Sequence, residues 1–404
     1  MNHGSIVLAG AGVLCLGAIV SAADADTKYD VGASGSEIRI GQTMPYSGPY
    51  SAAGVIGRTE IAYFQMINAH GGINGRHVRF ISLDDGYSPP KTLELTRRLV
   101  EEENVLAIVG SFGTPTNAAI QTYLNERRVP QLFIQAGASR WNDPAHFPWT
   151  MPFVNLLRSE AKVYASPILS DRPDARVAVL YQNDDFGRDY LDGLKEGLGA
   201  RADRMIVATA SYETSDPTVD SQIIRLASSG ADTLLIAAGP KFAALALRKA
   251  SDIDWRPTRF LAQVSAASPK ALEAAGLDKA VGVITAGSFK SIGDPEWAND
   301  PDYLAWQEFM RTDYPHGDVR DGFTFVGYSN AVFFAEVLRR CGDNLTRENL
   351  MNVAAHLNGV RMPDLLPGVT VNTSPTDYEP LKQMQLRRFD GKQWTPLAKQ
   401  SRSD

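Results

Sequence analysis

Hydrophobic and polar positions alternate along most of this chain in a pattern that predicts strands and helices in turn. Short apolar runs of strand length are followed by stretches with helical spacing, which is typical of parallel sheets covered by helices on both faces. The pattern predicts a long helix that stops at Gly71-Gly72. It also predicts strands at 38–43, 77–83, 105–109, 131–134, 175–181, 205–210 and 233–237, and helices at 116–126, 187–198, 219–228 and 241–251.

The end of the chain has a different pattern. Residues Met384–Phe389 alternate in polarity, Asp390-Gly391 is a turn pair, and Gln393–Thr395 continues the alternation, which predicts an antiparallel hairpin. Two connecting segments rich in proline and aromatic residues, at 149–152 and 288–295, divide the predicted strands and helices into groups. We therefore expect more than one domain.

Length and composition support this expectation and exclude some functions. A chain of 404 residues with 44% hydrophobic content is long enough for two domains. The net charge is -6 and no basic run is present, so a nucleic-acid partner is not expected. The six histidines are scattered and no two have the spacing of metal ligands, so we expect no metal site.

The first 23 residues form a separate block. Ile6–Val20 is apolar and uncharged, and Val20–Ala23 offers small residues for cleavage, which together predict a secretory signal peptide. The run is short for a membrane span. The stretch Met1–Gly4 lacks Lys and Arg, so an uncleaved anchor or a misassigned start stays open. After cleavage only Cys341 would remain, so no internal disulfide is expected even though a secreted chain reaches an oxidising compartment.

Sequence signatures of enzymes were sought and not found. The chain has no Gly-x-Ser-x-Gly elbow, no phosphate-binding loop ending in Gly-Lys-Ser/Thr, no His-Glu-x-x-His and no Cys-x-x-Cys. The carboxylate pairs Asp84-Asp85 and Asp184-Asp185 are sequence neighbours, which favours turn and helix-cap roles over facing acid and base roles. We expect neither an enzyme nor a cofactor.

Two loops that follow predicted strands carry the candidate chemistry. Gly110–Thr114 and Gln135–Ser139 consist mainly of small residues and each ends in a hydroxyl group. Open α/β sheets bind ligands at the carboxyl ends of their strands. Glycines let the backbone approach a ligand closely, and free amides at a helix start suit a carboxylate. These loops therefore predict a binding site for a small acid.

The order of these features resembles a known family. A strand, a Ser-Gly-Pro loop at 47–49, a helix, the turn GGINGR at 71–76, a strand and DDGYSPPK at 84–91 precede the two loops. Over residues 37–400 the chain is similar to type I periplasmic solute-binding proteins of ABC importers. Within them it resembles the leucine/isoleucine/valine-binding family and its aromatic-acid branch.

The resemblance implies an α/β fold of two Rossmann-like lobes, with parallel sheets flanked by helices and joined by three crossover segments. The implied lobe 1 comprises residues 37–156 and 290–365, and the implied lobe 2 comprises 157–289 and 366–404. The lobes of such proteins close on their ligand about a hinge. Carried over motif by motif, the ligand-binding residues would be Tyr46, Ser47, Phe112, Gly113, Thr114, Gly137, Ala138, Ser139, Phe186, Gly239 and Val264.

Two departures from the family pattern bear on the ligand. Amino acid binders carry a Glu where this chain has Val264, and a Tyr that Ala53 replaces here. A buried ammonium group needs a charged or strongly accepting partner. The departures favour an acid with an apolar or aromatic body. Trp141 and Trp149 lie in a segment similar to that of aromatic-acid members, and they either line the cleft or, as we favour, serve as structural anchors.

The resemblance thus implies a periplasmic receptor that captures a small carboxylate and delivers it to the membrane permease subunits of an ABC importer. We expect a monomer. One rival is a branched-chain amino acid-binding protein of an ABC importer. A second rival, the sensing domain of a receptor or regulator, would need another membrane span or an output domain, and the sequence up to Asp404 contains neither.

Overall fold

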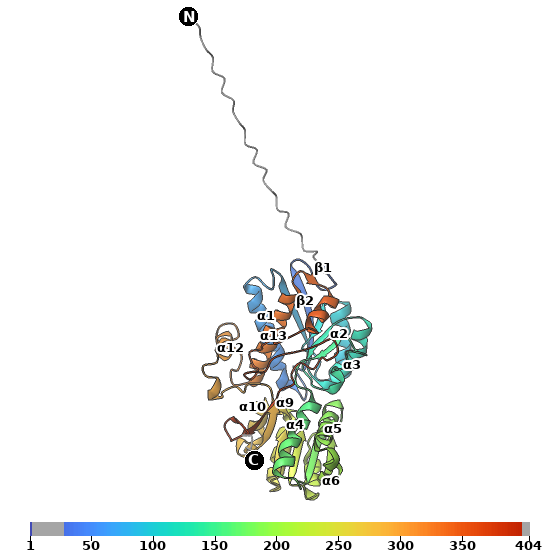
Figure 1. Cartoon of the computed structure of the whole chain (residues 1–404), viewed down its shortest axis with the longest axis vertical. Helices are drawn as coiled ribbons and strands as arrows, with labels where there is room; N and C mark the ends of the chain where they lie inside the picture. Colours follow the sequence, from blue (N-terminus) through green and yellow to red (C-terminus); the bar gives the residue numbers. More distant parts are fainter. Residues whose placement is uncertain (2–27, 398–404) are drawn as a thin grey trace.

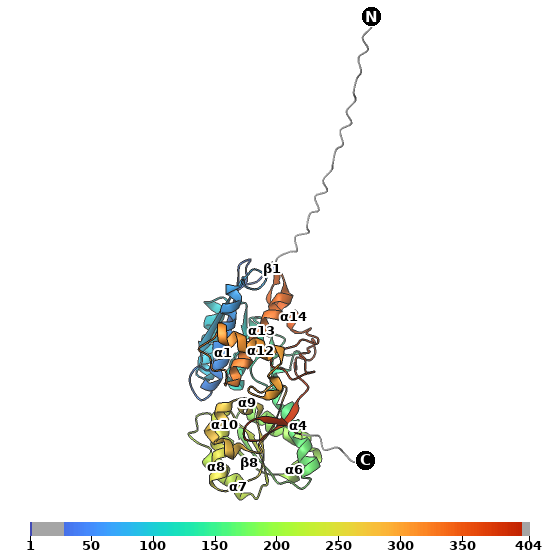
Figure 2. The same cartoon turned by 90° about the vertical axis from the view of Figure 1, so that its left-hand side faces the viewer.

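The computed structural model describes Met1 and residues 28–397, which form two lobes stacked along the long axis (Figure 1). The same two lobes are visible after a quarter turn (Figure 2). The expected signal peptide at residues 1–23 lies outside the described residues, apart from Met1. Among the residues described, no helix combines the length and the apolar character needed to cross a bilayer.

Lobe 1 is built on a five-stranded sheet in the order β3-β2-β4-β5-β6. All its strands are parallel, and they are β3 (His77–Asp84), β2 (Glu37–Met44), β4 (Ala107–Val109), β5 (Gln131–Ile134) and β6 (Thr150–Pro152). Its main helices are α1 (Gly54–Ala69), α2 (Pro89–Glu101), α3 (Thr114–Glu126), α12 (Pro301–Thr312), α13 (Gly322–Cys341) and α14 (Arg347–Ala354). Helices α1 and α13 pack on one face of the sheet, and α2 and α3 pack on the other.

Lobe 2 contains a seven-stranded sheet in the order β14-β13-β11-β10-β9-β7-β8. Five strands are parallel: β7 (Val177–Gln182), β8 (Ile206–Tyr212), β9 (Thr233–Ala237), β10 (Thr258–Leu261) and β11 (Ile284–Gly287). The strands β13 (Gln385–Phe389) and β14 (Trp394–Pro396) add the antiparallel hairpin that the sequence predicted. The longer helices are α4 (Leu157–Asp171), α5 (Asp185–Leu198), α7 (Asp220–Ser228) and α8 (Pro240–Asp252).

The chain crosses between the lobes three times, and hydrogen bonds tie the crossings together. Ser288 Oγ lies 2.9 Å from Asn155 Oδ1 and 2.5 Å from the carbonyl oxygen of Gln383. The Asn155 amide donates to the carbonyl of Leu381 at 3.0 Å. The expected fold class, two α/β lobes with parallel sheets flanked by helices and joined by three crossovers, is confirmed. Val371, still in the core of lobe 1, lies beyond the expected lobe boundary at 365.

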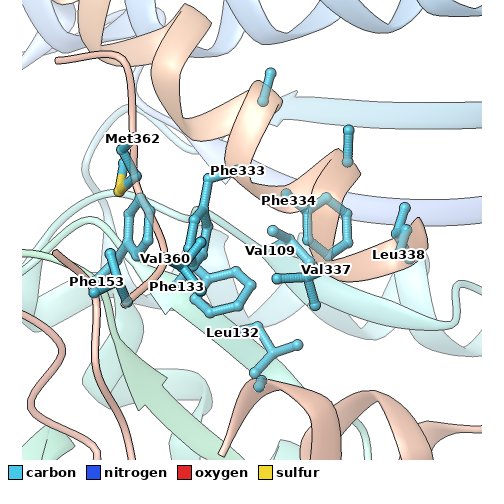
Figure 3. Packing of buried hydrophobic residues seen from close by; sticks show 14 of the residues in the cluster. Val109, Leu132, Phe133, Phe153, Phe333, Phe334, Val337, Leu338, Val360 and Met362 are labelled. Carbon is cyan, nitrogen blue, oxygen red and sulfur yellow. The ribbon is translucent and has the colours of Figure 1, made fainter. Parts of the chain in front are cut away.

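An aromatic cluster fills the core of lobe 1 beside the second candidate loop. Figure 3 shows Phe133, Phe153, Phe333 and Phe334 gathered together, and the rings of Phe133 and Phe333 are 5.0 Å apart at their centres. Phe133 has a φ of 56°, which is a strained value for a bulky residue inside a strand. The packed rings hold this conformation, and the register of β5 against β6 shifts at the same place. The distortion lies directly before the loop that begins at Gln135.

Capping explains where the helices around the site begin. The Asp184 carboxylate accepts from the amides of Phe186 and Gly187, so α5 starts two residues before the predicted position. Asp85 accepts from the Tyr87 amide at 2.9 Å and orders the turn before α2. Both aspartates therefore have the turn and cap roles predicted for them. Helix α3 begins at Thr114 because Pro115 suits its first turn.

Candidate ligand-binding site

A cavity lies between the two lobes, at the carboxyl ends of the parallel strands. It encloses about 850 Å³ of atom-free space, its open mouth included. Among the described residues, no lysine, arginine or histidine lines it. Its apolar and aromatic wall is formed by Tyr50, Ile56, Tyr87, Phe112, Phe153, Val154, Leu157, Phe186, Tyr190, Val264, Ala267, Phe289, Phe323 and Val326.

The first predicted loop reaches this cavity with Phe112, Gly113 and Thr114. Gly113 has a φ of 102°, and a Cβ there would lie 2.4 Å from the ring of Tyr87, so only glycine fits. The Thr114 hydroxyl is buried and has no hydrogen-bond partner among the described residues. Asn117 Nδ2 donates to the Gly113 carbonyl at 2.8 Å and fixes the loop. Thr114 is thereby held as a free donor in the wall.

The second predicted loop contributes Gln135, Ala136 and Gly137 to the cavity. The Gln135 amide nitrogen Nε2 is buried and has no partner among the described residues. A Cβ on Gly137 would lie 2.2 Å from the carbonyl oxygen of Asn155, so the loop passes too close to the hinge for a side chain. The two loops together thus carry a buried hydroxyl and a buried amide group that have no hydrogen-bond partner among the described residues.

Ala138 and Ser139, the next residues of the second loop, do not line the cavity. The Ser139 amide donates to the Asp189 carboxylate at 2.5 Å, which joins lobe 1 to α5 of lobe 2. Arg140 makes a second contact of this kind with Asp185 at 2.8 Å. The end of the loop therefore holds the lobes together in this closed arrangement.

Tyr46 and Ser47 also lie outside the cavity lining. The Tyr46 hydroxyl bonds to Ser82 at 2.6 Å, and Ser47 donates to Asp84 at 2.7 Å, so both serve the fold of lobe 1. Burial raises the pKa of Tyr46 to about 12, and its hydrogen bond to Ser82 opposes this shift.

The tyrosine of this region that reaches the cavity is Tyr50, which directly follows the Ser-Gly-Pro loop. The replacement of the family's tyrosine by Ala53 stays a prediction, but this side of the cavity does have a tyrosine, Tyr50. The Tyr50 ring stacks on Tyr87 with centres 4.0 Å apart, and its hydroxyl donates to Gln182 in lobe 2 at 2.6 Å. Its position immediately after Pro49 is the sequence feature that could have identified Tyr50 as a cavity residue.

Phe186 and Val264 line the cavity as predicted, on the lobe 2 side. Phe186 is at the start of α5, and Val264 is in the short helix α9 (Gln263–Ala266). Gly239 is not in the lining. Instead, its Cα packs against Tyr50, and a Cβ there would come within 2.3 Å of the Tyr50 hydroxyl. Gly239 thus permits close approach of the two lobes.

A carboxylate that sequence reasoning missed lies in the wall of lobe 2. Glu160, in the first turn of α4, is 2% exposed and lines the cavity. Burial raises its pKa to about 7, against the effect of hydrogen bonds from Tyr164, Tyr190 and the Gln263 amide. The sequence feature that could have identified Glu160 is its place as a charged residue on an apolar helix face, four residues before Tyr164.

A second buried glutamate lies deeper in lobe 1. Glu60 on α1 accepts from Gln42 at 2.5 Å and from Asn330 at 3.3 Å. Burial raises its pKa to about 8. It lines a smaller cavity of about 250 Å³, which shares Gln135, Phe153 and Asn330 with the main one.

The two tryptophans of the aromatic segment do not line the main cavity. Trp141 is fully buried against Ile134, Ala136 and Ala138, and Trp149 packs against the core of lobe 1. This agrees with the anchor role favoured from sequence. Residues 28–397 contain no group of three or more His, Cys, Asp or Glu side chains placed to hold a metal ion.

Comparisons with known proteins agree with this architecture. The sequence profile of a periplasmic binding protein family matches residues 37–393. A relative described as Leu/Ile/Val-binding protein homolog 7, from Brucella abortus, is 25% identical over 232 residues. The match covers 55% of this chain and 57% of that relative, so the chain spans little more than half the length of the curated relatives it matches.

Three solved structures illustrate the shared fold. A substrate-binding periplasmic protein from Ralstonia solanacearum has a TM-score of 0.78 at 22% identity, over 89% of this chain and 100% of that one. A branched-chain amino acid ABC transporter protein from Thermus thermophilus with bound valine has a TM-score of 0.78 at 17% identity, and the match covers 90% of this chain and 96% of that one. A fatty acid ABC transporter substrate-binding protein from Thermomonospora curvata has a TM-score of 0.78 at 21% identity, and the match covers 93% of this chain and 95% of that one.

Because the profile spans most of the sequence, the chain belongs to the periplasmic binding protein family. Members of this family are solute-binding receptors and not enzymes. The two lobes and the cavity between them are the features of this class.

Proposed function

We propose that this protein is the receptor of an ABC importer and that it captures a small carboxylate with an apolar or aromatic body between its lobes. The observation that carries the proposal is the composition of the cavity wall. Its surface is apolar and aromatic, and lobe 1 adds two buried donors, Thr114 Oγ1 and Gln135 Nε2, that have no partner within residues 28–397. A carboxylate accepts from such donors, while the wall buries the body of the ligand.

The proposed ligand residues are those predicted residues that also line the cavity, with two additions. Phe112, Gly113, Thr114, Gly137, Phe186 and Val264 belong to the first group, and Tyr50 and Gln135 are the additions. The proposed partners are the membrane permease subunits of an importer, and the proposed location is the periplasm. We expect the receptor to act as a monomer.

Titration calorimetry with two kinds of solute tests the proposal. Benzoate, a hydroxycinnamate and phenylpyruvate represent acids without an amino group, and leucine represents the amino acids. The proposal predicts binding of at least one of these acids, with leucine weaker or not detected. Micromolar binding of leucine, with no response to any acid that lacks an amino group, would contradict it.

A branched-chain amino acid remains the second candidate ligand, and Glu160 is the observation that favours it. Its buried carboxylate in the lobe 2 wall is an acceptor of the kind that a ligand ammonium needs. The Thermus thermophilus protein with bound valine has the same fold. Against this candidate, Glu160 already accepts three hydrogen bonds from the protein.

A further inference from the structure

The surroundings of Glu160 are more specific than a structural carboxylate requires. Its Oε1 accepts from the backbone amide of Gln263 at 2.9 Å and lies 2.5 Å from the Tyr164 hydroxyl. Its Oε2 accepts from the Tyr190 hydroxyl at 2.8 Å. These partners come from α4, α5 and α9, so the carboxylate is fixed from three directions while its side chain also forms part of the cavity wall.

Glu160 retains capacity for one more donor. An ionised carboxylate has about four acceptor positions, and the protein fills three of them. Oε2 has a single donor, Tyr190, which itself lines the cavity. Glu160 is one of the lining residues, so a donor on a bound ligand would approach the remaining position from the cavity.

The two walls of the cavity therefore differ in chemistry. Lobe 1 presents the donors Thr114 and Gln135, and lobe 2 presents the acceptor Glu160. A ligand that matches both walls has an acceptor group at one side and a donor group at the other. A plain carboxylic acid matches only the first wall.

We propose that Glu160 determines specificity by accepting a hydrogen bond from a hydroxyl or ammonium group of the bound acid. This inference rests on the proposed function and narrows it to acids that carry such a donor. A hydroxyl is the donor expected under the main proposal, and an ammonium is the donor expected under the alternative. A buried acceptor left unpaired by the wrong ligand is what gives such a site its discrimination.

The protonation state of Glu160 distinguishes a ligand hydroxyl from a ligand ammonium group as the donor. Burial places its pKa at about 7, so both of its forms are populated near neutral pH. A ligand ammonium prefers the ionised form, and its affinity should rise between pH 6 and 8. A hydroxyl can donate to the ionised form or accept from the protonated form, so its affinity should change less. Among the described residues, the titratable partners of Glu160 are Tyr164 on its own helix and Tyr190 on α5, and Tyr50 and Tyr87 line the same cavity.

Matched ligand series measured by calorimetry test this inference. The aromatic series is 3-phenylpropionate, 3-phenyllactate, 3-(4-hydroxyphenyl)propionate and phenylalanine. The aliphatic series is 4-methylpentanoate, 2-hydroxy-4-methylpentanoate and leucine. The parent should bind at least one donor-bearing acid about tenfold or more tighter than the plain acid of its series.

The variant Glu160→Gln should reduce this preference by about tenfold or more, while its affinity for the plain acid stays within about threefold. Glu60→Gln makes the same change at the buried glutamate outside the main cavity, and it should keep the parent's preference. If Glu160→Gln does not fold, Tyr190→Phe replaces it. Removing this protein donor should strengthen the preference for donor-bearing acids.

Three results would overturn the inference. These are a parent that shows no preference for donor-bearing acids, an unchanged preference in Glu160→Gln, and an unchanged or weaker preference in Tyr190→Phe. Each of them leaves the proposed function standing as long as an acid without an amino group binds. If the parent binds no acid of either series that lacks an amino group, the proposed function, on which this inference rests, is overturned.

Discussion

At the scale of single residues, Thr114 places a hydroxyl group in the cavity wall at the first position of α3. A buried hydroxyl without a partner is unfavourable in the ligand-free protein. A ligand oxygen that accepts from it removes this cost, and the nearby amides at the start of α3 favour a negative charge on that oxygen. We therefore propose that Thr114 contributes to ligand binding and not to the stability of the lobe.

Replacing Thr114 with valine should weaken binding of the acid by about 0.5–3 kcal/mol, because the shape is kept and the donor is lost. Calorimetry gives the affinity, and thermal unfolding should show little change. Ser139→Ala provides the comparison, since the Ser139 hydroxyl is also buried but lies outside the cavity lining. Equal affinities of the parent and Thr114→Val would place the carboxylate elsewhere.

Glu60 provides a separate test of the residue-scale electrostatics. Its pKa is raised by burial from 4.5 to about 8, so the folded protein keeps a proton that the unfolded chain releases. The stability from this group is complete below pH 4.5 and is lost as the pH rises to about 8. In between, the free energy of unfolding should fall by up to about 1.4 kcal/mol per pH unit.

Denaturant unfolding of the parent and Glu60→Gln at pH 5, 6, 7 and 8 checks this expectation. Glutamine stays neutral, so the variant should gain stability relative to the parent as the pH rises. Asp364 and Glu160, whose pKa values are raised to about 7, affect both proteins alike and cancel in the comparison. Parallel pH profiles would show that Glu60 titrates normally.

Some site residues were predictable from sequence and others were not, for a physical reason. Gly113, Thr114 and Gly137 belong to short loops whose chemistry is local, and all three line the cavity. Glu160 acquires its role from Tyr190 and Gln263, which are 30 and 103 positions away. No local pattern records such distant partners.

At the scale of elements, the distance between the lobes is limited by the contact between the segment before η1 in lobe 1 and the segment before α8 in lobe 2. Tyr50 precedes the short 3-10 helix η1 (Ser51–Ala53) in lobe 1, and Gly239 caps α8 in lobe 2. A Cβ on Gly239 would lie 2.3 Å from the Tyr50 hydroxyl. The φ of Gly239 is -72°, which any residue adopts, so only the opposite lobe requires glycine here.

Gly239→Ala should therefore disfavour the closed arrangement without disturbing either lobe. We expect a loss of ligand affinity worth about 1–3 kcal/mol, the usual cost of such overpacking. Unfolding of the ligand-free variant should match the parent. Gly35→Ala is the control, because a Cβ there would meet only the Tyr29 hydroxyl at 3.9 Å. Undiminished affinity in Gly239→Ala would mean that binding does not require this contact.

Element type was easier to predict than element boundaries. The alternation of strands and helices followed from hydrophobic spacing, and the hairpin of β13 and β14 followed from its alternation and turn pair. The distortion at Phe133 was hidden, because the packing of aromatic rings from α13 and the hinge region holds its unusual backbone. Such tertiary constraints leave no trace in local spacing.

At the scale of the whole molecule, three crossovers and several contacts across the cleft describe a closed receptor. The hydrogen bonds among Asn155, Ser288 and Gln383 hold the crossovers side by side at the hinge. Arg140 also pairs with Asp185 in the other lobe. The surface pairs contribute little individually, so opening about the hinge needs few broken contacts.

Small-angle X-ray scattering of the protein with and without a saturating acid ligand tests whether the two lobes close on the ligand. We expect a larger radius of gyration without ligand. On saturation the radius of gyration should fall, and the scattering profile should match that of the closed structure. Calorimetry on the same sample confirms that the ligand is bound. An identical scattering profile with and without bound ligand would contradict capture by closure of two lobes.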